Sequence, residues 1–181
     1  MGDGGAIFTN DDELARLIGM IASHGQSKLY THDVVGCNSR LDALQAAILR
    51  VKLPHLDDFI ARRRAVADRY DSAFKGLKKV QTPFRHQRSE HVFHQYTLLL
   101  NGVDREALRE HLQRSGIPSM IYYPIPLHRQ NAFADFNQTG KSFQVTERLC
   151  ESVLSLPIHT EMDLEQQELI IDKVNQFLSE N

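Results

Sequence analysis

Two tyrosines, two prolines and a histidine lie close together in the segment Tyr122-Tyr123-Pro124-Ile125-Pro126-Leu127-His128. Proline fixes the backbone, and each tyrosine carries a hydroxyl group on a stiff ring. A rigid segment with polar tips is suited to forming the wall of a ligand site. The residue types fit a surface turn with buried rings equally well, so both interpretations stay open at this point.

Histidines and cysteines offer other chemistry, but their spacing is incomplete. His91 and His94 stand three residues apart in a predicted strand, where such positions point to opposite faces. No cysteine or carboxylate pattern completes a metal site, so none is predicted, and His94 is expected to be buried in the core. Cys37 and Cys150 lie far apart, and no nucleophile motif such as G-x-S-x-G accompanies them. Two isolated thiols are typical of a reducing compartment, and we expect a cytoplasmic protein.

Glycines open the chain as Gly2-Asp3-Gly4-Gly5. Glycine permits positive φ angles and close approach of the backbone. A phosphate-binding loop would need G-x-G-x-x-G after a strand or a Walker spacing, whereas these glycines precede a strand predicted at residues 6–9. A turn is therefore predicted here.

The composition of the 181 residues excludes some partners. The formal net charge is -2 and the pI is about 6.5, so no general field attracts nucleic acid or an anionic membrane. No apolar stretch approaches the roughly 18 residues of a membrane span. The basic run 62–64 is flanked by Asp57, Asp58 and Asp68, which predicts a solvated helix face of mixed charge.

Apolar spacing and caps predict the elements that position these residues. A helix capped by Thr9 or Asn10 buries Leu14, Leu17, Ile18 and Ile21 and ends near Gly25. Residues 25–38 are predicted as a long loop, and such loops are often functional. Residues 39–42 form a capping-box pattern, and Pro54 should kink the next helix or start another that reaches Gly76.

Strands and helices alternate after residue 77, following a polar loop at residues 77–90. Strands are predicted at 92–100, 120–123 and 154–158, with an irregular segment at 124–140. Helices are predicted from Asp104 to Gly116, over a face of Val145, Leu149 and Val153, and from Asp163 onward. This alternation predicts an α/β layer architecture.

Five segments together resemble one known family, the DegT/DnrJ/EryC1/StrS sugar aminotransferases, in order and spacing over essentially the whole chain. They are GDGGAIFTNDDELA, HGQSKLYTHDVVGCNSRLDALQAAIL, KLPHLDDFIARRRAVADRYD, HVFHQYTLLL and IPSMIYYPIPLHRQ. The resemblance implies a pyridoxal-phosphate (PLP) enzyme with the aspartate aminotransferase fold, fold type I. It further implies a homodimer with each site built from both subunits.

The family moves an amino group, usually from glutamate, to a keto group on a nucleotide-linked sugar, and a lysine holds PLP as a Schiff base. In the family this lysine lies a few residues before the GDGG turn, so it is expected to precede Met1. With it would go the aspartate that pairs with the pyridinium nitrogen and most phosphate-binding residues. The seven lysines of this chain do not match the catalytic position: Lys28, Lys52, Lys75, Lys78, Lys79, Lys141 and Lys173.

We therefore expect the C-terminal half of such an enzyme, inactive alone and without covalently bound PLP. Residues 1–55 would be a remnant of the large domain with the cross-dimer loop, 56–76 a long connecting helix, and 77–181 the small α/β domain. Parted from its sheet, the remnant should expose apolar residues that the intact domain would bury, such as Ile7, Phe8 and Leu17, and so form a dimer or pair with a missing N-terminal half. The alternative is a non-catalytic binding or regulatory module that keeps the fold.

The resemblance also implies roles for residues of the cross-dimer loop. By this resemblance, Asn38 is expected to reach the cofactor phosphate of the partner subunit. Its place at a predicted helix start, which favours an anion, fits that role. Arg40 resembles a residue that points toward substrate in the neighbouring site, where a guanidinium suits a carboxylate or phosphate. The alternative for Arg40 is an ion pair with Asp33 or Asp42.

Tyr122 and Tyr123 correspond to the substrate-side wall of the subunit's own site. Many relatives carry His-Tyr-Pro where this chain has Tyr-Tyr-Pro, so the role of that histidine does not transfer directly to Tyr122. His128 ends the motif, as a substrate contact or as a brace for the loop. Tyr30 and His32 are further substrate candidates. The HGQSK form of the loop resembles enzymes that act on UDP-linked 3-keto sugars, including hexuronates, in surface-polysaccharide synthesis.

Overall fold

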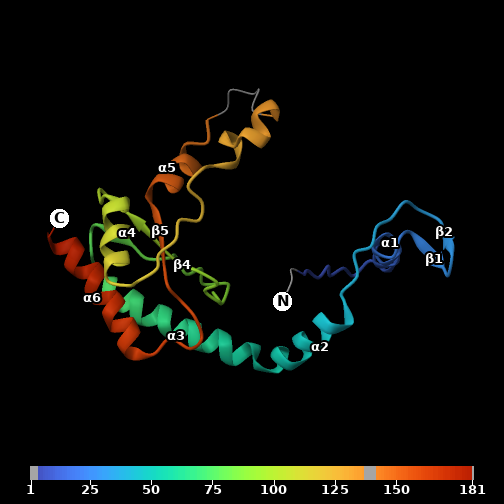
Figure 1. Cartoon of the computed structure of the whole chain (residues 1–181), viewed down its shortest axis with the longest axis horizontal. Coiled ribbons are helices and arrows are strands. Elements are labelled where there is room, and N and C mark those ends of the chain that lie inside the picture. The colour runs from blue at the N-terminus through green and yellow to red at the C-terminus, as the bar shows by residue number, and fades with distance from the viewer. Residues whose placement is uncertain (1–3, 137–141, 181) are drawn as a thin grey trace. The chain divides into compact units, whose positions relative to one another are not determined.

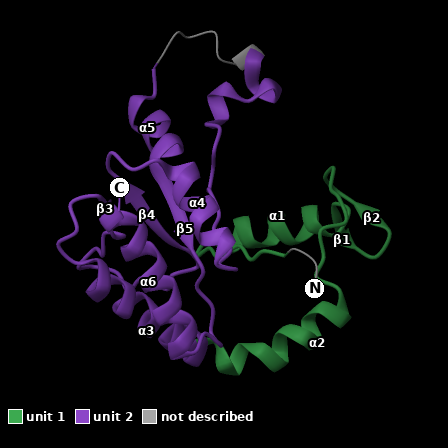
Figure 2. Ribbon diagram, turned by 60° about the vertical axis from the view of Figure 1, so that its left-hand side comes forward, with its two compact units in different colours: residues 1–56 green, residues 57–181 purple. Residues whose placement is uncertain are grey.

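The computed structural model describes residues 4–136 and 142–180 and divides the chain into two compact units, Met1–Leu56 and Asp57–Asn181 (Figures 1 and 2). Gly2 and Asp3 of the predicted turn, and Lys141, lie outside the described residues, so the turn stays a prediction. Within the described part of the chain, no helix is both long enough and apolar enough to cross a membrane.

The first unit begins with helix α1, Asp12–Ala22. Its N-cap is Asp11, whose side chain accepts a hydrogen bond from the backbone N–H of Leu14 (3.0 Å), so the predicted cap at Thr9 or Asn10 is wrong. The strand predicted at residues 6–9 is also wrong, because these residues join neither of the described sheets. Ile7 and Phe8 are exposed, as predicted.

A small antiparallel hairpin follows, formed by β1, Gln26–Lys28, and β2, Thr31–His32. The structureless loop predicted here is therefore wrong. Gly25 has a φ of 77°, and a Cβ at this position would lie 1.7 Å from the carbonyl oxygen of Val34. The chain that follows β2 then satisfies one of the last carbonyls of α1, because the backbone N–H of Cys37 donates to the carbonyl oxygen of Ile21 (2.8 Å).

Helix α2, Ala43–Lys52, leads into the short 3-10 helix η1, Leu53–His55, and then into α3, Leu56–Phe74. The predicted restart at Pro54 is confirmed. The predicted capping box is wrong, because Asp42 is itself the N-cap of α2 and its side chain makes no cap hydrogen bond.

The second unit contains a three-stranded antiparallel sheet of β3, Val80–Gln81, β4, Tyr96–Leu100, and β5, Val153–Leu156, in that order across the sheet. Val80 pairs with Leu100, and Leu98 pairs with Leu154. The predicted strand at 92–100 is shortened because Phe93 has a φ of 49°, which is incompatible with an extended strand. The predicted strand at 120–123 is reduced to a single bridge between Met120 and Ser155.

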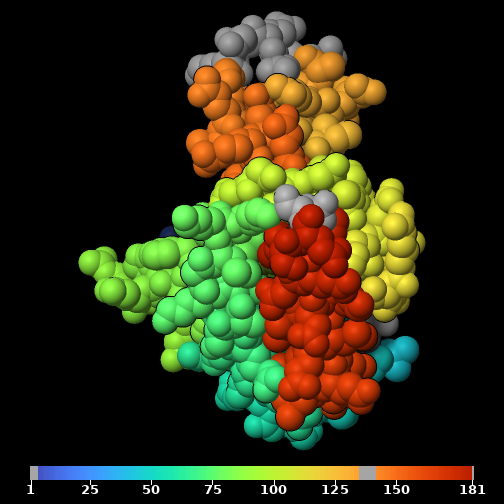
Figure 3. Space-filling view, turned by 90° about the vertical axis from the view of Figure 1, so that its left-hand side faces the viewer, coloured from blue at the N-terminus to red at the C-terminus, as the bar shows by residue number. Residues whose placement is uncertain are grey.

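Helices α3, α4 (Arg105–Arg114) and α6 (Leu164–Glu180) share one hydrophobic core with this sheet. The ring centroids of Tyr70 on α3 and Tyr96 on β4 are 4.9 Å apart, and both side chains are fully buried. The cap predicted at Asp104 is confirmed, since its side chain accepts from the N–H of Ala107 (3.0 Å). Space-filling shows α3 and α6 side by side on one face (Figure 3).

The basic run on α3 is only partly the solvated face that the sequence predicted. Arg62 and Arg64 form exposed ion pairs with Glu161 (3.1 Å) and Glu90 (2.8 Å). Arg63 instead donates to the carbonyl oxygens of Phe93 (2.9 Å) and His94 (3.1 Å). It therefore fixes the turn that precedes β4.

The chain between the single bridge at Met120 and β5 forms the 3-10 helices η2, Leu127–Arg129, and η3, Asn131–Phe136, and the helix α5, Gln144–Ser152. The apolar face predicted for α5 is wrong in detail. Val145 is 64% exposed, Val153 already belongs to β5, and the residue that α5 buries is Cys150.

Candidate functional site

An apolar cavity of 660 Å³ lies in the second unit between the segment 122–130 and helix α5. One wall is formed by the two tyrosines and the proline-rich chain after them, and the other by one face of α5 and the start of β5. The lining residues are Tyr122, Tyr123, Pro124, Ile125, Pro126, Leu127, Gln130, Thr146, Leu149, Cys150 and Val153. We call this hollow the tyrosine cavity.

Tyr122 and Tyr123 lie just beyond the edge of the sheet, after the bridge at Met120. Their ring centroids are 5.8 Å apart in an edge-to-face arrangement. Tyr122 is 37% exposed and Tyr123 is 71% exposed, so neither ring is buried in the core. The sequence interpretation as a turn with buried rings is wrong, and the geometry is that of a cavity wall.

His128 and Arg129 of η2 both contact Glu147 of α5. Nε2 of His128 lies 3.0 Å from one carboxylate oxygen of Glu147, and Arg129 forms an ion pair of 2.9 Å with the other. The hydrogen bond from His128, helped by the charge of Arg129, lowers the pKa of Glu147 below its ordinary value. His128 therefore braces the loop, and its predicted contact with substrate stays a prediction. Sequence reasoning missed Glu147.

In the first unit the structure brings Asn38 and Arg40 together. Nε of Arg40 donates to Oδ1 of Asn38 at 3.1 Å, and both residues are exposed. Among the described residues Arg40 forms no ion pair, so the alternative partners Asp33 and Asp42 are not used. The remaining polar groups of the pair are the Asn38 amide N–H groups and the terminal guanidinium nitrogens of Arg40, all of them donors.

The helix-start argument for Asn38 is wrong. Helix α2 begins at Ala43 with Asp42 as its N-cap, so Asn38 lies four residues before the cap. An anion near Asn38 would be held by the amide and by Arg40, since the carboxylate of Asp42 stands at the helix terminus.

Tyr30 and His32 lie in the hairpin. Tyr30 occupies the turn with a φ of 61° and is 83% exposed. Nδ1 of His32 lies 2.8 Å from the carbonyl oxygen of His24 and donates to it, because a carbonyl only accepts. His32 therefore stabilises the hairpin, and the predicted substrate contacts of both residues stay predictions.

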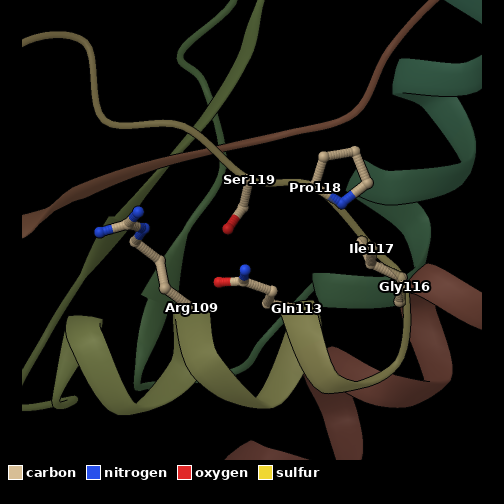
Figure 4. Close-up of a pocket in the computed structure, with 6 residues that line it drawn as sticks. All are labelled: Arg109, Gln113, Gly116, Ile117, Pro118 and Ser119. Carbon is tan, nitrogen blue, oxygen red and sulfur yellow. The ribbon is translucent and has the colours of Figure 1, made fainter.

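Other candidate sites carry less chemistry. His94 is exposed and precedes β4, so the expected burial is wrong, and Nδ1 of His91 accepts from the N–H of Phe93 (2.9 Å). No cluster able to hold a metal occurs within residues 4–136 and 142–180. A separate hollow of 490 Å³ lies beside α4, where Gln113 and Ser119 face each other (Figure 4).

The residues fit a PLP-dependent site in part. A phosphate or carboxylate suits the donor pair of Asn38 and Arg40, because a guanidinium and an amide offer only hydrogen-bond donors to it. Among the described residues, no lysine lines the tyrosine cavity. Lys79 bonds to the carbonyl oxygen of Leu178 (2.8 Å), within the second unit.

The fold is the C-terminal part of a fold type I PLP enzyme, as predicted. S. venezuelae DesV, solved in complex with a ketimine intermediate, is matched with a TM-score of 0.88 and 36% identity, over 94% of this chain and 45% of that one. The chain belongs to the DegT/DnrJ/EryC1/StrS aminotransferase family, whose model matches residues 1–175.

Two curated relatives show the range of functions in this family. The UDP-2-acetamido-2-deoxy-3-oxo-D-glucuronate aminotransferase of Pseudomonas aeruginosa is 45% identical, over 90% of this chain and 44% of the relative. The "Pleiotropic regulatory protein" of Geobacillus stearothermophilus is 42% identical, over 97% of this chain and 47% of the relative. The chain thus spans about half the length of the curated relatives that it matches.

Proposed function

We propose that this chain forms the substrate-facing part of a PLP-dependent aminotransferase that moves an amino group from glutamate to a UDP-linked 3-keto sugar. The observation that carries the proposal is the tyrosine cavity, which a member of an aminotransferase family builds from the predicted wall residues. The P. aeruginosa relative, named for a UDP-linked 3-oxo sugar, supports the substrate class. The two free cysteines suit the cytoplasm.

Each part of the chain has a distinct role in this proposal. Tyr122 and Tyr123 orient the sugar and exclude water from one side of the site, because their rings form a stiff wall with polar tips. Asn38 and Arg40 hold anionic groups across a homodimer interface: the amide takes the cofactor phosphate and the guanidinium takes a phosphate or carboxylate of the substrate. Tyr30 lies on the same unit and extends the substrate contact.

PLP, when bound, supplies the electron sink for amino-group transfer. We propose that the lysine which binds it covalently is not among those of this chain. The absence of lysine from the described lining of the tyrosine cavity supports this. The chain alone is then expected to be inactive and to act together with the N-terminal part that carries the lysine. The boundaries 1–55, 56–76 and 77–181 remain part of this proposal.

The test has two parts. The purified chain is mixed with PLP, its absorbance is recorded, and borohydride reduction is followed by peptide mass mapping. We expect no stoichiometric labelling of one lysine. The chain is then combined with the part of the P. aeruginosa relative that precedes the matched region, and glutamate-dependent amination of the UDP-linked 3-keto sugar is assayed.

Activity that requires both polypeptides and glutamate, and that falls with Arg40→Gln but not with Arg50→Gln, supports the proposal. Arg50 is a matched control because it is an exposed arginine of the same unit. Turnover by the chain alone, or one fully labelled lysine, would contradict the proposed inactivity. No activity in any combination would contradict the assignment.

The second candidate is a non-catalytic regulatory module, which the name of the G. stearothermophilus relative favours. This candidate predicts that the chain binds a partner with the same affinity in the presence and absence of PLP. Isothermal titration of the partner into the chain, with and without PLP, distinguishes the two functions. An aminotransferase requires the cofactor for its activity, whereas the binding of a regulatory module does not depend on it.

A further inference from the structure

Glu147 joins the two walls of the tyrosine cavity. It lies on α5 next to Thr146, which lines one wall, and its two partners lie on η2, immediately after Leu127 of the other wall. Figure 3 shows the two segments side by side at one end of the second unit. The contact therefore lies beside the cavity and links the segments that form its two walls.

The contact uses both oxygens of the carboxylate. Oε1 of Glu147 accepts from Nε2 of His128 at 3.0 Å, and Oε2 pairs with Nη2 of Arg129 at 2.9 Å. The side chains of His128 and Glu147 are only 16% and 22% exposed. The ring of Phe143 lies against His128, with centroids 4.8 Å apart, and limits the positions that the imidazole can adopt.

Ion pairs between exposed side chains contribute little, because water screens them and long side chains lose entropy. The Arg114–Glu110 pair is of this kind, with side chains 79% and 67% exposed on one helix turn. Glu147 differs because it is mostly shielded from water and connects separate segments. Across a hollow there are few van der Waals contacts to hold the walls together, so polar contacts beside it carry that role.

We propose that Glu147 is a positioning residue, which through His128 and Arg129 sets the width of the tyrosine cavity and the placement of Tyr122 and Tyr123. That these tyrosines face substrate rests on the proposed function, whereas the clamp between the two walls does not. The carboxylate remains ionised at neutral pH, since its pKa is lowered, and so keeps both partners.

Fluorine NMR of the chain labelled with 3-fluorotyrosine tests the placement directly, because the protein has five tyrosines and no tryptophan. In Glu147→Ala we expect the signals of Tyr122 and Tyr123 to shift or broaden. The signals of Tyr70 and Tyr96, which are fully buried in the core, should remain unchanged. Glu147→Gln, which keeps one acceptor, should give an intermediate effect.

Glu151→Ala is the matched control, an exposed glutamate on the same helix that makes no ion pair among the described residues. It should leave all five signals unchanged. Unchanged Tyr122 and Tyr123 signals in Glu147→Ala would overturn the proposal. Equal shifts at Tyr70 and Tyr96 would also overturn it, because Glu147 would then support the unit as a whole.

The thiol of Cys150 gives a second readout, because it lines the cavity and is 9% exposed. In a Cys37→Ser background, Glu147→Ala should increase the rate of maleimide modification at least about fivefold, because fivefold corresponds to the strongest exposed ion pairs and this contact is better shielded from water. An unchanged rate would contradict the clamp. If the complemented enzyme shows no aminotransfer but both readouts respond, the proposed function fails and the clamp stands.

Discussion

Two buried tyrosines of the second unit donate to different kinds of acceptor, and their removal should have unequal effects on stability. The hydroxyl of Tyr96 donates to Oδ1 of Asp71 at 2.6 Å, whereas that of Tyr70 donates to the carbonyl oxygen of Pro157 at 2.9 Å. Burial raises the pKa of both phenols, so both stay neutral donors at pH 7. A hydrogen bond to a charged group contributes about 1.5–3 kcal/mol and a neutral one about 0.5–1.5 kcal/mol.

The loss in the free energy of unfolding expected for Tyr96→Phe lies in the lower half of the range for a hydrogen bond to a charged group. Asp71 keeps a second partner when the phenol is removed, because Nη2 of Arg85 lies 2.6 Å from its other oxygen. The free energy of unfolding should therefore fall by about 2 kcal/mol in Tyr96→Phe, against about 1 kcal/mol in Tyr70→Phe.

Urea denaturation at pH 7, followed by tyrosine circular dichroism, measures this difference. With a slope near 2 kcal/mol/M, the midpoint should fall by about 1 M in Tyr96→Phe and by about 0.5 M in Tyr70→Phe. Tyr123→Phe is the control, because this ring is 71% exposed, and its midpoint should not change. A loss in Tyr70→Phe that equals or exceeds the loss in Tyr96→Phe would refute the reasoning that the charged acceptor dominates.

Three further predictions follow from caps, core packing and the clamp. The pKa of Glu147 is lowered from 4.5, so its ionised form stabilises the folded state above pH 4.5, and this contribution is lost as the pH falls through the pKa of the folded state. Protection from hydrogen exchange at residues 122–130 should therefore drop as the pH falls through that value. It should not drop in Glu147→Gln, which has no carboxylate to protonate. Leu154→Ala should cost about 2–5 kcal/mol in chemical denaturation, because Leu154 is 0% exposed, whereas Leu164→Ala, 59% exposed, should cost less than about 0.5 kcal/mol. Asp104→Ala should lower stability by about 1 kcal/mol and Asp104→Ser should restore most of it; equal melting temperatures of both variants would count against the cap.

The helices of the second unit could be predicted because their signals are local. The caps and apolar spacing of α4 and α6 agree with the surfaces that these helices bury. Ile170 and Val174, four residues apart on α6, are both in the core. Where a local preference and the tertiary packing agree in this way, the sequence is sufficient.

The hairpin of the first unit could not be predicted for a physical reason. Its strands are two and three residues long and almost wholly exposed, so they carry no alternation of apolar and polar residues. At residues 6–9 the reverse is true, because Ile7 and Phe8 predict a strand that the fold does not form. A β-prone segment becomes a strand only beside another strand, and the described chain offers none there.

The residues of the candidate site likewise divide into those that could be predicted from the sequence and those that could not. The wall of Tyr122 and Tyr123 could be predicted because prolines and aromatic residues stand together in sequence. Glu147 could not, since its partner His128 lies nineteen residues away and nothing in α5 distinguishes one glutamate from the other before folding. A contact of that kind becomes visible only in three dimensions.

The close approach at Gly25 has a consequence for how this loop can diversify. A Cβ at Gly36 would lie 2.2 Å from the backbone nitrogen of Gly25, so the two glycines let main chain pack directly on main chain. Two positions thus determine the shape of the hairpin. The side chains at its exposed tip, Leu29 and Tyr30, are largely in contact with solvent and do not support the fold by packing. We expect a combinatorial library at the tip to yield mostly folded members, and a library at the glycines to yield almost none, which makes the tip a natural place to alter selectivity.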